Sequence, residues 1–164
     1  VAPNYLPYVG WRSLCMASGA ANGVLASSFL LYAVGLGQGA IPVAGAVNWV
    51  LKDGLGQAGT LLMARFMAQT FDDNARGWYI RGTLLMNIAI GIEIATCFAP
   101  EYFLFMGAAA NSLKGLAWLT LGATCSAFNM AFQKKSNIAD IYARSTTQSI
   151  TVSLLGTGAG AWLA

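Results

Sequence analysis

The apolar positions of this chain come in long, nearly unbroken runs, and the few charged positions are gathered between them. Thirty-nine uncharged residues separate Arg12 from Lys52. A single helix of that length would be about 58 Å long, roughly twice the thickness of the hydrocarbon core of a bilayer. The run therefore predicts two helices, and the glycine-rich segment 35–39 followed by Pro42 is the natural break between them.

The same reasoning along the chain predicts an all-α fold, a polytopic transmembrane helix bundle of about five spans, with four and six as the outer bounds. The runs are too long to be the roughly ten-residue alternating strands of a membrane barrel. No internal repeat or low-complexity linker interrupts them, so we expect residues 1–164 to form a single integral membrane domain. The fourth span would rise about 48 Å, so it either tilts strongly or breaks near Gly115 or Gly122. The expected spans are residues 13–36, 41–69, 78–99, 102–133 and 139–164.

Composition agrees with a lipid environment. Only 9 basic and 6 acidic residues occur among 164, whereas charged residues make up about a quarter of a soluble domain. Hydrophobic residues account for 57% of the chain, and the mean hydropathy is +0.58. These figures exclude a soluble globular domain, which needs a charged shell, and they also exclude a disordered chain. The 19 glycines are typical of membrane helices that pack closely.

Residue types that are absent or isolated narrow the chemistry. The chain has no histidine, which excludes histidine-ligated zinc and haem and the Ser-His and Cys-His nucleophile pairs. Cys15, Cys97 and Cys125 stand far apart with no CxxC motif, so we expect no metal site and no disulfide framework. The net charge of +3 is too small to indicate nucleic-acid binding, and without an acid–base or nucleophile pair we expect no enzyme. The sequence starts at Val1 rather than Met, so we also expect upstream processing or trimming.

The basic residues predict the orientation in the membrane. With five crossings, one face carries the N-terminus and the two loops at 70–77 and 134–138, while the other carries the turns at 36–41 and 100–101. Cations favour the cytoplasmic or equivalent side, so the N-terminus should face the cytoplasm, stroma or matrix. Trp11 and Trp78 would lie at this basic interface as part of an aromatic belt. The seven basic residues near this face are Arg12, Arg65, Arg76, Arg81, Lys134, Lys135 and Arg144.

Four ionisable residues lie inside the expected spans, namely Lys52, Asp53, Glu93 and Lys114. An ionised side chain is energetically costly inside the bilayer unless it is paired with an opposite charge or hydrated, so each of the four is a candidate functional residue. Asp53 and Lys114 both lie about 18 Å from the charge-poor face, which predicts an ion pair between them. Lys52 would then pair with Glu93. Three roles remain open: internal pairs that fix helix register, a proton or substrate path, and contacts to a partner or cofactor.

Glycine patterns predict where helices approach one another. Gly54-Leu55-Gly56-Gln57-Ala58-Gly59 matches GxGxxG, but a dinucleotide fingerprint must connect a strand to a helix, and here it lies in the middle of an apolar helix. We interpret it as a small-residue face for helix packing. Gly19 and Gly23 have the same interpretation, as has the glycine-rich segment 156–160.

Several motifs, taken in order, resemble one family. Pro3-Asn4-Tyr5-Leu6-Pro7-Tyr8, Trp11-x-Ser13, Val34-Gly35-Leu36-Gly37 and Trp49-Val50-Leu51-Lys52-Asp53-Gly54-x-Gly56 are followed by Asp73-Asn74-Ala75-Arg76-x-Trp78, Gly122-Ala123-Thr124 and Asn137-x-Ala139-Asp140. This series resembles the ROOT UV-B SENSITIVE (RUS) family of membrane proteins over nearly the whole chain, as a divergent member. The resemblance implies a plastid location rather than a mitochondrial one, and it carries little chemistry because no activity is firmly attached to the family.

The chain departs from the family pattern mainly at polar positions. The pattern has an Asp at Arg12, acidic residues at Thr83 and Asn87, an Arg at Cys125, a His near Ala131 and Gln-Glu at Gln148-Ser149. Lys52-Asp53 and Asp140 are kept. Loss of polar groups together with retention of packing glycines points to a structural role.

These observations together predict a non-catalytic structural or accessory membrane subunit at the periphery of a larger organellar complex, such as a photosystem or antenna assembly of a plastid thylakoid. Its partners would be membrane lipids and other membrane subunits. Lipids are the expected bound molecules, and chlorophyll or carotenoid would be added in a photosystem, with Glu93, Asn87 or Gln57 as axial ligands to chlorophyll. The alternative is a small-molecule or ion transporter that uses Lys52, Asp53, Glu93 and Lys114.

Overall fold

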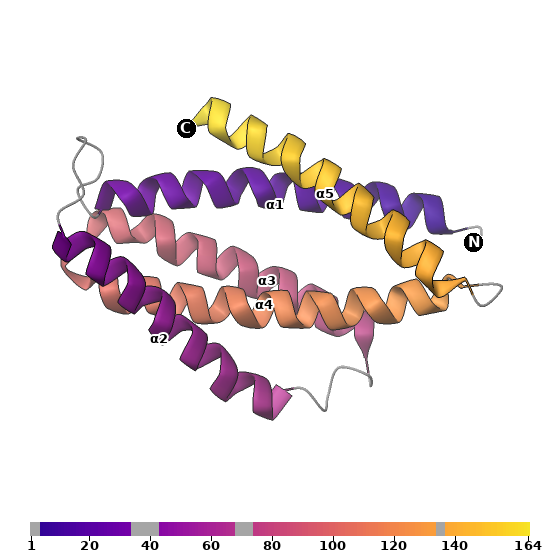
Figure 1. Ribbon diagram of the computed structural model, residues 1–164, viewed down its shortest axis with the longest axis horizontal. Helices are drawn as coiled ribbons and strands as arrows, with labels where there is room; N and C mark the ends of the chain where they lie inside the picture. The colour runs from indigo at the N-terminus through magenta and orange to yellow at the C-terminus, as the bar shows by residue number, and fades with distance from the viewer. Residues whose placement is uncertain (1–3, 34–42, 68–73, 134–136) are drawn as a thin grey trace. The chain divides into compact units, whose positions relative to one another are not determined.

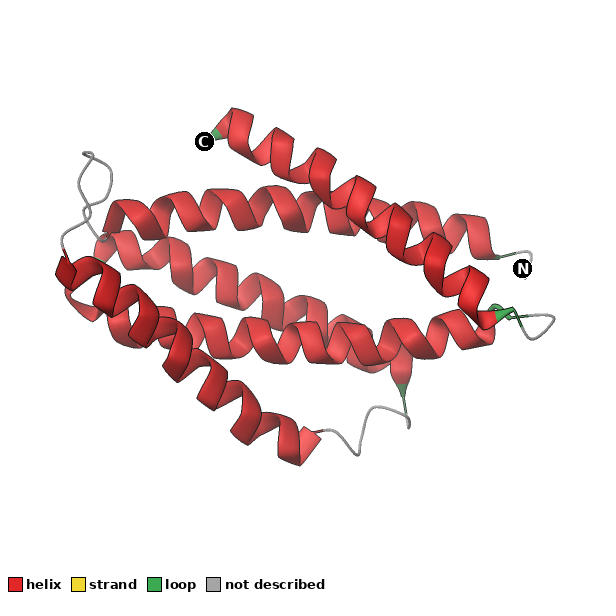
Figure 2. Ribbon diagram, viewed as in Figure 1, coloured by secondary structure: helices red, strands yellow, loops and turns green. Residues whose placement is uncertain are grey.

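The computed structural model describes residues 4–33, 43–67, 74–133 and 137–164. In this part of the chain every regular element is a helix and there is no strand, so the predicted all-α class is confirmed (Figures 1 and 2). The α-helices are α1 (Tyr5–Ala33), α2 (Val43–Met67), α3 (Ala75–Ala95), α4 (Phe103–Ala131) and α5 (Ile138–Leu163). Two 3₁₀ turns, η3 (Thr96–Phe98) and η4 (Pro100–Tyr102), join α3 to α4.

The helix boundaries follow local chemistry. Asn74 caps α3, because its side chain accepts a hydrogen bond from the Gly77 backbone N–H. Pro100 ends the preceding turn and opens η4, where its missing N–H is tolerated. Helix α1 begins at Tyr5, eight residues before the predicted start of the first span, and accommodates Pro7 in its first turn.

Helix α4 is continuous over 29 residues, a rise of about 44 Å. It shows neither of the breaks that the sequence suggested at Gly115 and Gly122. The predicted break around residues 35–42 lies outside the described residues, as do Lys134 and Lys135.

The chain divides into two compact units, Val1–Leu25 with Cys125–Ala164, and Ala26–Thr124. The first unit contains the N-terminal part of α1, the C-terminal end of α4, and α5. Helices α1 and α5 run in the same direction and approach closely, because Gly160 faces the Ala21 backbone while Gly156 faces the Ala17 backbone oxygen. Tyr5 packs edge-on against Phe132, with ring centroids 5.4 Å apart.

The second unit is formed by the end of α1, helices α2 and α3, and most of α4. Gly82 on α3 packs against Thr120 and Leu121 on α4, and Glu93 reaches Lys114, so α3 and α4 run in opposite directions. Helix α2 runs parallel to α4, because Gly56 lies against Asn111 and, further along both helices, Thr60 lies against Gly115.

The buried side chains of the described residues are both apolar and polar. Several buried side chains are polar or charged, and the fully buried ones include Thr96, Thr120 and Thr124. Each of these hydroxyls donates to the carbonyl four residues earlier in its own helix. Many large apolar side chains are exposed, such as Phe105 at 77% and Trp162 at 85%. The described residues thus bury polar side chains together with apolar ones and leave many large apolar side chains exposed.

Among the described residues, length and hydropathy qualify two helical segments as candidate membrane spans, Tyr5–Ala33 and Ala75–Phe98, with mean hydropathies of 1.5 and 1.4. Only 11% and 28% of these windows are buried, which leaves most of their apolar surface open to the surroundings. The five-span arrangement remains a prediction.

Candidate functional site

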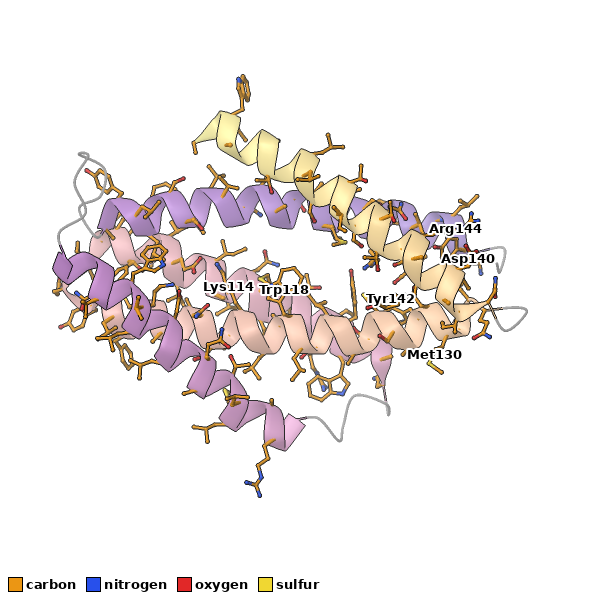
Figure 3. All side chains as sticks on the ribbon, in the orientation of Figure 1. Lys114, Trp118, Met130, Asp140, Tyr142 and Arg144 are labelled. Atoms are coloured by element: carbon orange, nitrogen blue, oxygen red, sulfur yellow. The ribbon has the colours of Figure 1, made fainter. Side chains whose placement is uncertain are left out.

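The four charged residues singled out in the sequence all belong to the unit Ala26–Thr124. Lys52 and Asp53 lie in the middle of α2, Glu93 is in the last turn of α3, and Lys114 is near the middle of α4, where Figure 3 labels it. Lys52, Asp53 and Lys114 lie well inside their helices, whereas Glu93 lies near the end of α3, just before η3. The site is therefore built from side chains on three helices.

Glu93 and Lys114 form a cross-helix ion pair. The Lys114 Nζ lies 2.5 Å from Glu93 Oε2, and the two side chains are 21% and 5% exposed. A buried carboxylate needs a counter-charge and hydrogen bonds to remain ionised at low cost. This pair ties α3 to α4 at one register.

Lys52 and Asp53 form a second pair within α2, with Nζ 2.6 Å from Oδ1. The Lys52 side chain is only 6% exposed, whereas that of Asp53 is 48% exposed. The ammonium group of Lys52 lies 4.5 Å from the centre of the Trp49 ring, and its aliphatic stem crosses Gly107 on α4. Buried Lys52 is therefore stabilised by a carboxylate, an aromatic face and the close approach that a glycine permits.

The predicted partners were wrong, although all four residues are paired. The sequence indicated Asp53 with Lys114 and Lys52 with Glu93, but the structure exchanges them. Depth along the helix axis says nothing about the direction in which a side chain leaves the helix. Adjacent residues on a helix point about 100° apart, yet the long stem of Lys52 folds back to reach its neighbour.

Asp53 faces α4 through an amide rather than through Lys114. The Asn111 Nδ2 donates to Asp53 Oδ1 at 3.3 Å and is 3.5 Å from the Asp53 backbone oxygen. As an uncharged amide, Asn111 was not among the charged candidates that the sequence singled out. Its position one turn before Lys114 did not indicate a contact with Asp53.

A seam of small and hydroxyl side chains continues the α2–α4 contact. The Ser112 Oγ donates to the Gly56 backbone oxygen at 3.1 Å, and the Thr60 Oγ1 is 3.2 Å from the Ser112 backbone oxygen. Gly59 lies against Ser112, and Gly115 lies against Thr60. Gly107 and Gly115 were missed as packing residues, although their spacing with Asn111 at i, i+4 and i+8 was visible in the sequence.

The packing glycines predicted from the sequence divide into two groups. Gly56 and Gly59 contact α4, as expected of a small-residue face. A methyl group placed at Gly19, Gly23 or Gly54 would meet no described atom within 4 Å, so these three do not pack against another described helix of the chain. The pattern gave the correct spacing but not the side of the helix that faces a neighbour.

The candidate pigment ligands are dispersed. The Glu93 carboxylate is bound to Lys114, and the exposed Asn87 donates through Nδ2 to the Thr83 carbonyl of its own helix at 2.9 Å. Gln57 is exposed on α2. Within the described ranges, no group of three or more His, Cys, Asp or Glu side chains could hold a metal ion.

Comparison with known proteins identifies the family. A family profile described as the vitamin B6 photo-protection and homoeostasis domain matches residues 1–164. Protein root UVB sensitive 6 of Arabidopsis thaliana is 37% identical over 96% of this chain and 32% of its own length. Protein root UVB sensitive 2, chloroplastic, of the same plant is 34% identical over 100% of this chain and 37% of its own.

A more distant relative is RUS family member 1 of Dictyostelium discoideum, 28% identical over 95% of this chain and 30% of its own length. The chain thus spans about a third of the length of the curated relatives it matches. No solved structure matches it significantly. The family profile covers every residue of the sequence, so the resemblance seen in the motifs is confirmed and the chain belongs to the root UVB sensitive (RUS) family.

Proposed function

We propose that this chain is a non-catalytic helical membrane domain of about five spans that acts as a structural or accessory subunit in a larger plastid membrane assembly. Its N-terminus faces the stroma, and its partners are lipids and other membrane subunits. The observation that carries the proposal is the self-contained pairing of the interior charges: Glu93 with Lys114 and Lys52 with Asp53.

Self-contained pairs favour a structural role over a chemical one. A catalytic or ligand-binding charge is normally presented to a cavity or poised beside a reacting group. Here the two most buried charged side chains, Glu93 and Lys52, are each bound to a partner in the same unit. Their effect is to fix the register of α2, α3 and α4.

The exterior supports a membrane partner surface. On α5, Leu154, Leu155 and Trp162 are 68%, 70% and 85% exposed, and α1 exposes Trp11 and Tyr32 at 71% each. A soluble monomer rarely leaves large apolar side chains uncovered in such numbers. Lipid acyl chains or neighbouring membrane helices would cover them.

The family supplies the process and the location of this proposal. The family profile names vitamin B6 photo-protection and homoeostasis, and one relative is named chloroplastic. We assign the subunit to an assembly that serves vitamin B6 homoeostasis in the plastid. Placement at the edge of a photosystem or antenna, with chlorophyll held by Glu93, Asn87 or Gln57, is a more specific version. Ligation by Glu93 would require its carboxylate to leave Lys114.

Isolation from native membranes tests the proposal. The chain, tagged at its C-terminus, is extracted with digitonin and separated on native gels. We expect it to migrate with other membrane polypeptides in fixed proportion, and to stay in the membrane after alkaline carbonate washing. The variant Leu154→Ser/Leu155→Ser should weaken the assembly, whereas Thr151→Ser on the same exposed helix should not. A free monomer from gently solubilised membranes would contradict the proposal.

A transporter is the second candidate, and the half-exposed carboxylate of Asp53 favours it. This carboxylate lies beside buried Lys52 and accepts a hydrogen bond from Asn111. Its side chain is 48% exposed, whereas that of Glu93, the other acid in these pairs, is 5% exposed. In proteoliposomes, a transporter would lose substrate-driven or proton-driven flux in Asp53→Asn, while Asp140→Asn on exposed α5 would transport normally. Equal flux in both variants would dismiss this role for Asp53.

A further inference from the structure

The parallel contact of α1 with α5 begins with two polar pairs. Arg12 donates from a guanidinium nitrogen to Ser145 Oγ at 3.1 Å, and Gln148 Nε2 donates to Ser13 Oγ at 3.0 Å. Ser145 is only 6% exposed, and its backbone oxygen accepts from Ser149 at 2.7 Å. The guanidinium group of Arg12 is therefore half-buried and hydrogen-bonded to the hydroxyl of Ser145.

The charge of Arg12 is not balanced by any carboxylate among the described residues. Three of the four described acids are taken: Asp53 by Lys52, Glu93 by Lys114, and Asp140 by Arg144, a pair labelled in Figure 3. The fourth, Glu101, is exposed and forms no ion pair within the described part of the chain. Arginine keeps its charge under physiological conditions, so its partial burial against a neutral serine leaves a positive charge without a counter-ion among the described residues.

The other described arginines do not share this situation. Arg65, Arg76 and Arg81 are exposed, and Arg81 lies over the Trp78 ring at 4.7 Å. Water can solvate those three guanidinium groups. Arg12 combines burial, a fixed hydrogen bond and an unbalanced charge.

We infer that Arg12, oriented by Ser145, binds a phosphate oxyanion from outside the chain. The planar fork of a guanidinium matches two phosphate oxygens, and one of its donors is already anchored to Ser145. An anionic phospholipid is one source of this oxyanion, because the N-terminal part of α1 also exposes large apolar side chains, Trp11 at 71% and Leu14 at 60%. Free inorganic phosphate has the same oxyanion and is the other source.

The lipid source rests on the proposed membrane location, so the two are tested separately. Carbonate extraction of the unmodified chain reports on the membrane location alone. Binding is measured on the purified full chain by native mass spectrometry with phosphatidylglycerol, and by isothermal calorimetry with inorganic phosphate. If carbonate washing releases the chain from the membrane, the calorimetry with inorganic phosphate still measures whether phosphate binding depends on Arg12.

We expect Arg12→Gln to weaken binding about tenfold or more in at least one arm. Arg12→Lys keeps the charge but loses the fork, so it should restore binding only in part. Arg81→Gln, the matched exposed arginine, should change binding less than about twofold. Loss in the lipid arm identifies a phospholipid, and loss only in the phosphate arm identifies free phosphate. Equal affinities of Arg12→Gln and Arg81→Gln in both arms, with unchanged circular dichroism, would overturn the inference.

Discussion

The ion pair between Glu93 and Lys114 should respond asymmetrically to the removal of either partner. In Lys114→Met, the Glu93 carboxyl group, 5% exposed, is left in the interior without its counter-ion. Removing one partner of a buried pair costs about 3–5 kcal/mol of folding free energy, because the remaining charge is both desolvated and unpaired. In Glu93→Gln, the ammonium of Lys114 is left instead, on a flexible stem that is already 21% exposed. On this stem the ammonium can move to another polar partner, so we expect a smaller loss of roughly 2 kcal/mol.

The double variant completes the cycle. Glu93→Gln/Lys114→Met combines the two single substitutions and removes both charges, so no unpaired charge is left in the interior. We therefore expect it to be more stable than Lys114→Met alone, with a coupling energy of at least about 2 kcal/mol. Arg144→Gln is the matched control, because its pair with Asp140 has side chains that are 76% and 56% exposed.

Equilibrium unfolding in mixed micelles provides the measurement. The purified chain is titrated with sodium dodecyl sulfate and followed by far-ultraviolet circular dichroism, which gives a free energy of unfolding for each variant. The order of destabilisation should be Lys114→Met, then Glu93→Gln, with no measurable change in Arg144→Gln. If Lys114→Met were as stable as Arg144→Gln, the reasoning on burial and pairing would be refuted.

Three further predictions concern glycines and a helix cap. Gly56→Ala would place a methyl group 2.6 Å from an α4 side chain and should lower stability by about 1–3 kcal/mol, whereas Gly54→Ala, which meets nothing within 4 Å, should raise it by roughly 0.5–1 kcal/mol in the same titration. Gly156→Ala would press on a backbone oxygen of α1 and should be more destabilising than Gly158→Ala, which has open space around it. A disulfide-trapping assay between α1 and α5 would report the separation of the two helices. Equal trapping in the two variants would contradict the close approach at Gly156. Asn74→Ala removes the cap of α3 and should cost about 1 kcal/mol, while Asn74→Asp, which keeps the acceptor, should cost less; thermal melts compare the two.

The sequence predicted the helices well because each is a long apolar run with a strong break. Pro100 and the Asn74 cap fall where the runs end. The identities of the four interior charges could also be read directly, since a charge within an apolar run has no other explanation than pairing or wetting. What spacing could not supply was the rotation of each helix about its axis.

That missing rotation accounts for both errors at the site. Lys52 and Asp53 pair with each other because the lysine stem bends along Trp49, and no rule of depth contains this freedom. Gly54 has the same local pattern as Gly56 but points away from α4. Only the packed structure decides which of two neighbouring glycines is in contact.

The placement of counter-charges has a consequence for how the chain enters a bilayer. Helix α2 carries Lys52 and Asp53 side by side, so it is electrically neutral at this point before any tertiary contact forms. Helices α3 and α4 each contribute only one half of their pair. In the membrane that we propose, α2 brings its charges into lipid already paired, whereas α3 and α4 should leave the translocation channel as one hairpin. Biogenesis would then proceed in steps set by where each helix finds its opposite charge.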